Sequence, residues 1–284
     1  MTKFTKFYKV IVSITCLFIA SNTNAQSWPP NGMNGLGTAI NPWEITTISH
    51  LLSLASFVNA GNGLLTAGKY YKLMNDVDFH NFHVQSFLGW SPIGDNLTNN
   101  ATFQGNFDGN NKVVANFQSN RISQDFIGLF GYIFHANIHN LKIETCDITG
   151  NRYVGGLVGQ VVNSTIENCY VNGSVTGTRY VGGLIGNIDN STIISNNYAD
   201  CIVRGNSDIG GLIGTNSGTV QTSYAKGIVY DTEQQAGGFV GCNYSYIIDC
   251  YAIGEVTGNE KHIGGFAGAN KEGTCHIGQC VSTI

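Results

Sequence analysis

Apolar residues and glycines recur with a fixed period along the second half of the chain. The string Val-Gly-Gly-Leu-Val-Gly at 154–159 returns, with conservative changes, at 181–186, 209–214, 236–241 and 263–268. The first glycines of these strings are 27, 28, 27 and 27 residues apart, at Gly155, Gly182, Gly210, Gly237 and Gly264. A weaker copy begins at Ile127, 28 residues before the first full one. A period of this length is typical of stacked structural repeats.

Each repeat has the pattern of short strands. It is rich in Val, Ile, Tyr and Thr, is interrupted by Gly and Asn, and shows no helical spacing of apolar residues. We expect about three strands of five residues per repeat, joined by tight turns. Such a unit cannot bury its own apolar face and must stack on its neighbours. The pattern therefore predicts an all-β fold, a right-handed single-stranded parallel β-helix that rises about 4.8 Å per coil.

The first half of the chain predicts a cap and irregular coils. Apolar residues at helical spacing predict a short amphipathic helix, which begins near Thr46 or Thr47 and ends near Gly61. They are Ile48, Leu51, Leu52, Ala55 and Val58. Such a helix would cover the first open edge of the solenoid and prevent end-to-end pairing. The predicted organisation is a signal peptide over 1–25, a cap and irregular first coils over 26–126, and repeats over 127–284.

The N-terminus has the pattern of a secretory signal peptide. Three lysines precede an apolar run over 10–20, and small residues follow at 23–25. The run is too short to span a membrane, which takes about 20 residues. The sequence therefore predicts an exported protein, secreted or at the cell surface, with no transmembrane segment after the signal is removed.

Composition narrows the class of partner. Charged residues make up 11% of the chain, and Gly supplies 37 of 284 residues. The formal net charge is −4, and removal of three N-terminal lysines would make it −7. This acidic balance argues against a nucleic-acid-binding protein, which normally has a basic surface.

Seven cysteines follow the signal peptide, and most are expected as small core residues. Cys250 and Cys280 fall at equivalent positions of adjacent coils if the last repeat carries an insertion. Their Cα atoms would then be about 5 Å apart, which permits a disulfide. No metal site or cofactor is predicted. His135 and His139 have the spacing of a zinc peptidase motif, but Ala136 follows where such a motif needs Glu, and strands flank them.

Three aspartates are candidates for acid/base chemistry. Asp76 and Asp78 share one face of a predicted strand, roughly 6.6 Å apart along it, and Asp108 follows on a nearby coil. That separation suits a glycosidase, so a polysaccharide lyase or hydrolase is the alternative to a non-catalytic protein. The other interpretation is that these carboxylates form corner hydrogen bonds and solvate the surface.

A column of tyrosines is the candidate binding site. Tyr170, Tyr198, Tyr224 and Tyr251 occupy one position in four successive repeats, each between two small residues. Because small residues suit the narrow interior, alternation along the strand points the rings outward. The column either binds a glycan or a partner surface, or only stabilises the register between coils.

The repeat resembles a known family. The string at 154–159, together with Asn168-Cys169-Tyr170 and Val175-Thr176-Gly177, is similar to the GLUG repeat, and the resemblance covers roughly 35–280. It implies an exported bacterial β-helix, often adhesin-like, and GLUG repeats also occur in non-catalytic parts of IgA-cleaving metallopeptidases. We therefore expect a non-catalytic secreted or surface binding protein that recognises a glycan or a host or cell-surface component. A purely structural spacer is a further alternative.

Overall fold

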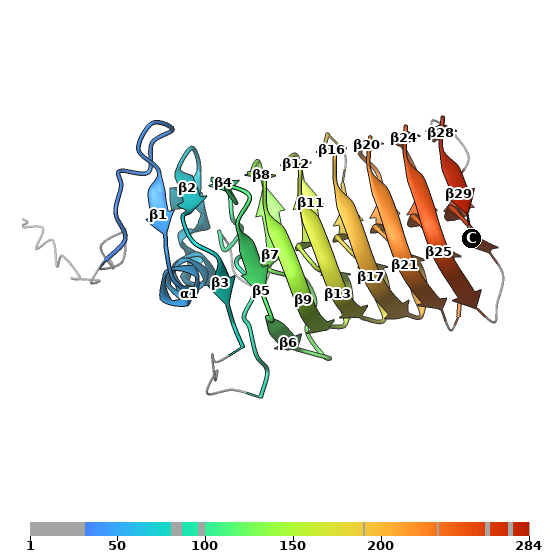
Figure 1. Cartoon of the computed structure of the whole chain (residues 1–284), viewed down its shortest axis with the longest axis horizontal. Coiled ribbons are helices and arrows are strands. Elements are labelled where there is room, and N and C mark those ends of the chain that lie inside the picture. Colours follow the sequence, from blue (N-terminus) through green and yellow to red (C-terminus); the bar gives the residue numbers. More distant parts are fainter. Residues whose placement is uncertain are drawn as a thin grey trace, which may run out of the picture.

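The computed structural model describes residues 32–80, 87–95, 100–189, 191–231, 233–258, 262–271 and 275–283. The predicted signal peptide lies outside these residues. The described chain winds into coils that stack along one long axis, and the corresponding strands of successive coils lie side by side (Figure 1). All strand pairs in its four sheets are parallel, so the predicted parallel β-helix is confirmed.

Each full repeat contains four strands. In the first they are β10 (Arg152–Gly155), β11 (Val158–Val162), β12 (Thr165–Glu167) and β13 (Tyr170–Thr176). The prediction of three strands was wrong because the Gly-Gly step divides one predicted strand into β10 and β11. A Cβ atom on Gly155 would lie 2.3 Å from the carbonyl oxygen of Val158, so only glycine permits this bend.

Four further repeats follow the same plan. The second comprises β14 (Arg179–Gly182), β15 (Ile185–Ile188), β16 (Ile193–Ser195) and β17 (Tyr198–Gly205). The third comprises β18 (Ser207–Gly210), β19 (Ile213–Asn216), β20 (Thr219–Gln221) and β21 (Tyr224–Asp231). The fourth comprises β22 (Ala236–Gly237), β23 (Val240–Asn243), β24 (Tyr246–Ile248) and β25 (Tyr251–Gly258). The fifth comprises β26 (Ile263–Gly264), β27 (Ala267–Asn270), β28 (His276–Gly278) and β29 (Val281–Thr283).

The earlier coils are less regular. Their strands are β1 (Trp43–Ile45), β2 (Tyr70–Leu73), β3 (Val77–Asp78), β4 (Asn106–Asp108), β5 (Val113–Ala115), β6 (Gln118–Asn120), β7 (Phe130–Phe134), β8 (Asn137–His139) and β9 (Lys142–Thr149). One sheet runs from β1 through β12 to β28, and another runs from β3 through β13 to β29. Strand pairing is therefore continuous from the irregular coils into the repeats, with one register shift between Val171 and Gly173 where β13 pairs with β9.

The predicted helix is present as α1 (Ile48–Phe57). A π turn over Val58–Asn62 and a 3-10 turn over Gly63–Thr66 extend it, and Gly61 has a φ of 88° in that extension. Leu51 and Leu54 are fully buried and belong to the same hydrophobic core as the coils. The helix lies beside the first strands of the solenoid (Figure 1), as expected for a cap.

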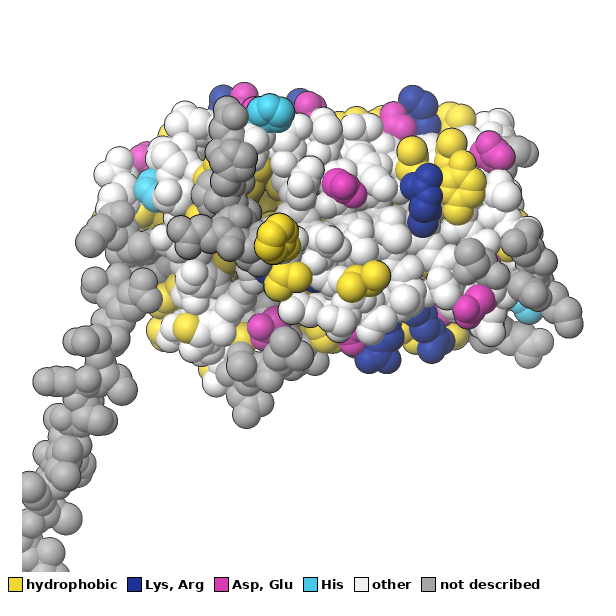
Figure 2. All heavy atoms as spheres, turned by 90° about the horizontal axis from the view of Figure 1, so that it is seen from below, with side chains coloured by type: hydrophobic (Ala, Val, Ile, Leu, Met, Phe, Trp, Pro, Cys, Tyr) yellow, Lys and Arg dark blue, Asp and Glu magenta, His cyan; other side chains and the backbone are white. Residues whose placement is uncertain are grey.

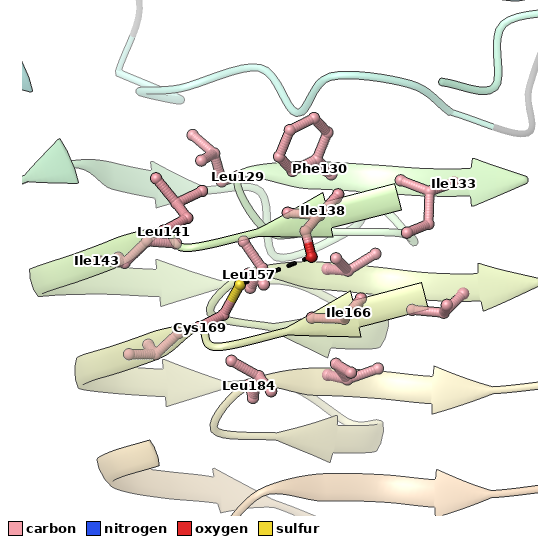
Figure 3. Close-up of a cluster of buried hydrophobic side chains, with 14 of the residues drawn as sticks. Leu129, Phe130, Ile133, Ile138, Leu141, Ile143, Leu157, Ile166, Cys169 and Leu184 are labelled. Carbon is pink, nitrogen blue, oxygen red and sulfur yellow. Dashed lines mark hydrogen bonds between the residues drawn. The ribbon is translucent and has the colours of Figure 1, made fainter. Parts of the chain in front are cut away.

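The interior is built from columns of apolar side chains. Ile138, Ile166 and Ile194 lie at matching positions of three successive coils and are fully buried. Leu129, Leu157 and Leu184 are also fully buried and form a second column. Figure 3 shows these leucines beside Ile138 and Ile166 in the interior. Burial of a Leu or Ile side chain contributes about 2 kcal/mol. Because every coil repeats the same contacts, the stack is stabilised along its whole length.

Candidate functional site

The predicted tyrosine column forms a continuous ladder of rings. Strand pairing places Tyr170, Tyr198, Tyr224 and Tyr251 side by side in β13, β17, β21 and β25. The ring centroids are 5.0, 3.9 and 4.7 Å apart along the column, and the last two pairs are stacked at 24° and 5°. The small neighbours on either side are buried, including Cys169 and Ala199, whereas the rings are partly exposed. The outward orientation inferred from alternation is therefore confirmed, and we call this column the Tyr ladder.

The cause of this arrangement is the corner that precedes each tyrosine. The residues two positions before the four tyrosines are Asn168, Asn196, Thr222 and Asp249, and their φ values are 53°, 56°, 50° and 55°. This is a left-handed conformation that Asn and Asp tolerate well. The next residue turns inward: the side-chain oxygen of Asn197 accepts from the backbone N–H of Cys169 at 2.9 Å. Ser223 accepts in the same way from the N–H of Asn197 at 3.1 Å. The inward residue fixes the corner, and the following tyrosine must point outward.

Polar side chains border the Tyr ladder. The hydroxyl of Tyr198 donates to Asp200 at 3.1 Å, and the same carboxylate accepts from Lys226 at 3.0 Å. Burial, followed by the carboxylates of Asp200 and Glu144, raises the pKa of Tyr170 above its ordinary value. Burial is also the first cause of the raised pKa of Tyr198 and Tyr224. The phenols of these three tyrosines therefore stay protonated at neutral pH. That of Tyr198 donates to Asp200 and offers its oxygen as an acceptor.

Stacking determines which parts of the rings face solvent. Between Tyr198, Tyr224 and Tyr251 the ring faces are turned toward one another. A ligand that lies along the column therefore meets ring edges and hydroxyl groups. These groups suit a hydroxyl-rich polymer that repeats along the solenoid axis.

A second aromatic column was not predicted. The rings of Phe126, Tyr153 and Tyr180 stack in three successive coils, with centroids 4.8 Å apart in both steps. The sequence signal was present, because the dipeptide Arg-Tyr directly precedes two of the glycine strings, at 152–153 and 179–180. The repeat was defined by its glycine strings, and these flanking residues lie outside the strings.

The three candidate aspartates are held in corner hydrogen bonds. Asp76 accepts from the backbone N–H of Val113 at 2.9 Å. Asp78 accepts from the side chain of Asn116 and from the N–H of His80, both at 2.8 Å, and these bonds lower its pKa. A general acid needs a carboxyl group whose pKa is raised, so this geometry favours the structural interpretation of Asp78.

Asp108 is the most connected of the three. It accepts from the N–H of Asn110 at 2.8 Å and from the side chain of Asn140 at 3.3 Å. Lys72 and His139 lie 3.3 and 3.5 Å from its carboxylate. Burial raises the pKa of Asp108, but the hydrogen bonds and these neighbours outweigh it and leave the pKa lowered. His139 thus contacts Asp108 from β8.

Cys250 and Cys280 occupy equivalent positions, since β25 and β29 pair Tyr251 with Val281 directly after them. Both carry free thiols in this structure, and the disulfide between them stays a prediction. Each thiol donates instead to a carbonyl two residues back, Cys250 to Ile248 and Cys280 to Gly278, both at 3.2 Å. Burial raises the pKa of Cys250 to about 12.

Among the described residues, no group of three or more His, Cys, Asp or Glu side chains is placed to hold a metal ion. No described helix is long and apolar enough to cross a membrane. Figure 2 shows one face of the molecule, where charged side chains are few and neutral surface predominates. This agrees with the low charged fraction of the sequence.

The repeats match a family model. Residues 150–176 and 232–257 match the model described as the GLUG motif. These two segments of the chain are GLUG repeats. The first match spans β10 to β13 and contains Tyr170, and the second contains Tyr251, so each of the two matched segments supplies one ring of the Tyr ladder.

Two longer proteins each resemble 64% of this chain. A candidate Gly-rich membrane protein from Evansella cellulosilytica is 37% identical over 191 residues, which are 64% of this chain and 21% of that protein. Halomucin from Haloquadratum walsbyi is 32% identical over 185 residues, 64% of this chain and 2% of that protein. The chain thus spans a small part of the length of these relatives.

A solved structure shares the fold. A candidate immunoglobulin A1 protease from Bacteroides ovatus superposes with a TM-score of 0.57 at 20% identity. The match covers 87% of this chain and 85% of that one. At this identity the similarity shows the fold alone.

Proposed function

We propose that this GLUG-repeat protein is a non-catalytic, secreted or cell-surface binding protein that recognises an extended glycan along the Tyr ladder. The observation that carries the proposal is the ladder itself: four partly exposed tyrosines in unbroken register, with their hydroxyls along one line. A regular solenoid offers a long face to a ligand that is itself repetitive. The name of the Evansella relative, a Gly-rich membrane protein, supports a location at the cell surface.

The charges beside the Tyr ladder favour a neutral glycan. Asp200 and Glu144 lie close enough to Tyr170 to raise its pKa, and Lys226 is paired with Asp200. Carboxylates accept hydrogen bonds from sugar hydroxyls but repel uronate and sulfate groups. A neutral polysaccharide thus gains bonds at both the tyrosines and the bordering carboxylates.

Affinity electrophoresis of the purified protein in gels with neutral polysaccharides tests the proposal. We suggest β-glucan, xylan and dextran. Replacement of Tyr198 and Tyr224 by Ser removes the two central rings and should weaken binding at least tenfold, which is about 1.4 kcal/mol. Tyr230→Ser is the matched control, since Tyr230 lies on the same strand as Tyr224 but outside the ladder.

Three results would contradict this function. Unchanged binding by the Tyr198→Ser, Tyr224→Ser variant would remove the ladder from the site. If the native protein binds none of the polysaccharides and the Tyr198→Ser, Tyr224→Ser variant melts at a lower temperature, the ladder serves stability and the protein is a structural spacer. Release of reducing ends that disappears in Asp76→Asn, Asp78→Asn or Asp108→Asn would establish the polysaccharide-active enzyme instead.

A further inference from the structure

The second aromatic column lies on a different sheet from the Tyr ladder. Tyr153 and Tyr180 belong to β10 and β14, and Phe126 precedes them by one coil. The stacking angles are 6° and 22°, and the ring of Tyr132 meets that of Phe126 edge-on at 5.6 Å. Beside this stack, Tyr132, Gln160 and Asn187 are in register on the next sheet. We call Phe126, Tyr153 and Tyr180 the corner ladder.

The backbone of the corner ladder is unfavourable for its residues. Phe126, Tyr153 and Tyr180 have φ values of 62°, 58° and 57°. Positive φ is unusual for bulky side chains, and such residues gather at functional sites. At the other corner of the same coils the chain places Asn at positive φ in three successive positions. The backbone of this corner does not require an aromatic residue either, because Asp208 holds a φ of 57° at the equivalent position of the next coil. The rings therefore serve stacking between coils, binding of a ligand, or both, and the variants below separate these roles.

Each tyrosine of the corner ladder carries a stacked arginine. The guanidinium carbon of Arg152 lies 5.8 Å from the ring centroid of Tyr153, and that of Arg179 lies 4.5 Å from Tyr180. Strand pairing sets the two arginines side by side, one coil apart. Their side chains are 50% and 51% exposed. Two guanidinium groups thus stand in line with the rings at the surface.

Aspartates hold these guanidinium groups in place. Asp125 accepts from Nε and Nη2 of Arg152 at 3.2 and 2.9 Å. Asp208, whose side chain is only 6% exposed, accepts from Nε of Arg179 at 3.0 Å. Within the described part of the chain, Nη1 and Nη2 of Arg179 have no hydrogen-bond acceptor. A guanidinium group that is held at Nε by a carboxylate and keeps its other N–H groups available is preorganised to bind a carboxylate or a sulfate.

We propose that the corner ladder is a second glycan site, specific for acidic polysaccharides. The outer N–H groups of Arg179 and Arg152 would bind carboxylate or sulfate groups on neighbouring sugars. The sugar rings would lie against the ring edges of Tyr153 and Tyr180, whose positive edges also favour anions. The column of Gln160 and Asn187, joined by a hydrogen bond of 2.9 Å, would supply amide groups for sugar hydroxyls. The two ladders then divide glycans by charge.

Affinity electrophoresis with three polymers tests this site. Polygalacturonate presents carboxylates, dextran sulfate presents sulfates, and dextran is the neutral reference. Arg179→Gln should weaken binding to an acidic polymer at least tenfold. Arg204→Gln is the matched control, because Arg204 also stacks on a tyrosine, Tyr230 at 4.8 Å, but lies on another sheet. Its binding should equal that of the native protein.

A second variant separates recognition from folding. Tyr153→Asn with Tyr180→Asn places at both corners the residue that the backbone prefers. We expect an unchanged or higher melting temperature together with loss of binding to the acidic polymer. A lower melting temperature with unchanged binding would show that the rings serve only the fold and would overturn the proposal.

Three further outcomes would also overturn the proposal. The native protein could fail to bind either acidic polymer, or the Arg179→Gln variant could bind an acidic polymer as tightly as the native protein does. The third outcome is that Arg204→Gln weakens this binding as much as Arg179→Gln does. Because the Tyr ladder is assayed on neutral polymers with other variants, failure of one site is distinguishable from failure of the other.

Discussion

The hydroxyl of Tyr198 donates a 3.1 Å hydrogen bond to Asp200, two residues along the same strand. Lys226 of the next coil donates to the same carboxylate oxygen. Asp200 therefore connects Tyr198 of the Tyr ladder to Lys226, its partner in the next coil. This bond keeps the phenol protonated and in a fixed direction, which a binding face requires and which also affects stability at high pH.

Stability should fall on the alkaline side. Burial and the bond to Asp200 raise the pKa of Tyr198, and burial raises that of Tyr180. A hydrogen bond to Cys242, together with burial, raises the pKa of Tyr244 to about 12. Burial does the same to Cys146 and Cys169, also to about 12. Groups whose folded pKa is raised stabilise the fold fully below their unfolded pKa, and this contribution is lost as pH rises through the folded value.

The loss should begin above about pH 8.5, where unfolded cysteines titrate, and should steepen above about pH 10 with the tyrosines. Melting temperatures measured by circular dichroism between pH 7 and pH 11 check this. A melting temperature that stays constant to pH 11 would contradict it. Asp200→Asn should show a smaller decline above about pH 10, because one cause of the raised pKa of Tyr198 is removed.

Asp108 contributes to the pH dependence of stability on the acid side. Its pKa is lowered, so its contribution to stability is present above the ordinary value of about 3.9 and is lost as pH falls through the lower folded value. Asp108→Asn should therefore lower the melting temperature at pH 7 and have little effect near pH 2. The exposed Asp147 provides a control, and Asp147→Asn should change the melting temperature little at either pH. An equal effect of Asp108→Asn at both pH values would show that its charge is not involved.

The repeat period determined how much of this fold the sequence could predict. Glycine strings 27 or 28 residues apart identify coils, and they place Tyr170 beside Tyr198 without further information. The four-strand coil was missed because the bend after Gly155 depends on a close backbone approach that composition does not reveal. The corner ladder was missed although Arg-Tyr precedes two of the glycine strings, because an aromatic residue does not indicate the left-handed backbone found at Tyr153. Repetition predicts register, whereas the conformation of each corner depends on tertiary contacts.

The cysteines provide a redox test. Cys250 and Cys280 lie at equivalent positions of adjacent coils, and Cys250 is 1% exposed. With its pKa raised to about 12, the Cys250 thiol should resist alkylation by iodoacetamide in the folded protein. After oxidation we expect a disulfide between Cys250 and Cys280 in non-reduced digests, detected by mass spectrometry. A free Cys250 under the same oxidising conditions would exclude this pair, and Cys280→Ser should leave Cys250 reduced.

The glycine strings should tolerate substitution poorly, and the reason is backbone contact. A Cβ atom at Gly155 would lie 2.3 Å from the carbonyl oxygen of Val158 and 2.7 Å from that of Leu184 in the next coil. Neither atom can move without shifting a strand, so Gly155→Ala should destabilise the protein by about 3 kcal/mol. Gly68→Ala is the control, because Gly68 has a φ of 67° but no neighbouring atom within 4 Å of the added Cβ. It should cost only the left-handed penalty of about 1 kcal/mol.

Urea denaturation followed by circular dichroism measures both variants. Because each coil contacts only its neighbours, the Gly155→Ala variant should also lose cooperativity and show a broader transition than the native protein. Equal free energies of unfolding for the two variants would show that the coils shift to accept a side chain. The glycine string would then reflect backbone conformation at the bend rather than close packing between coils.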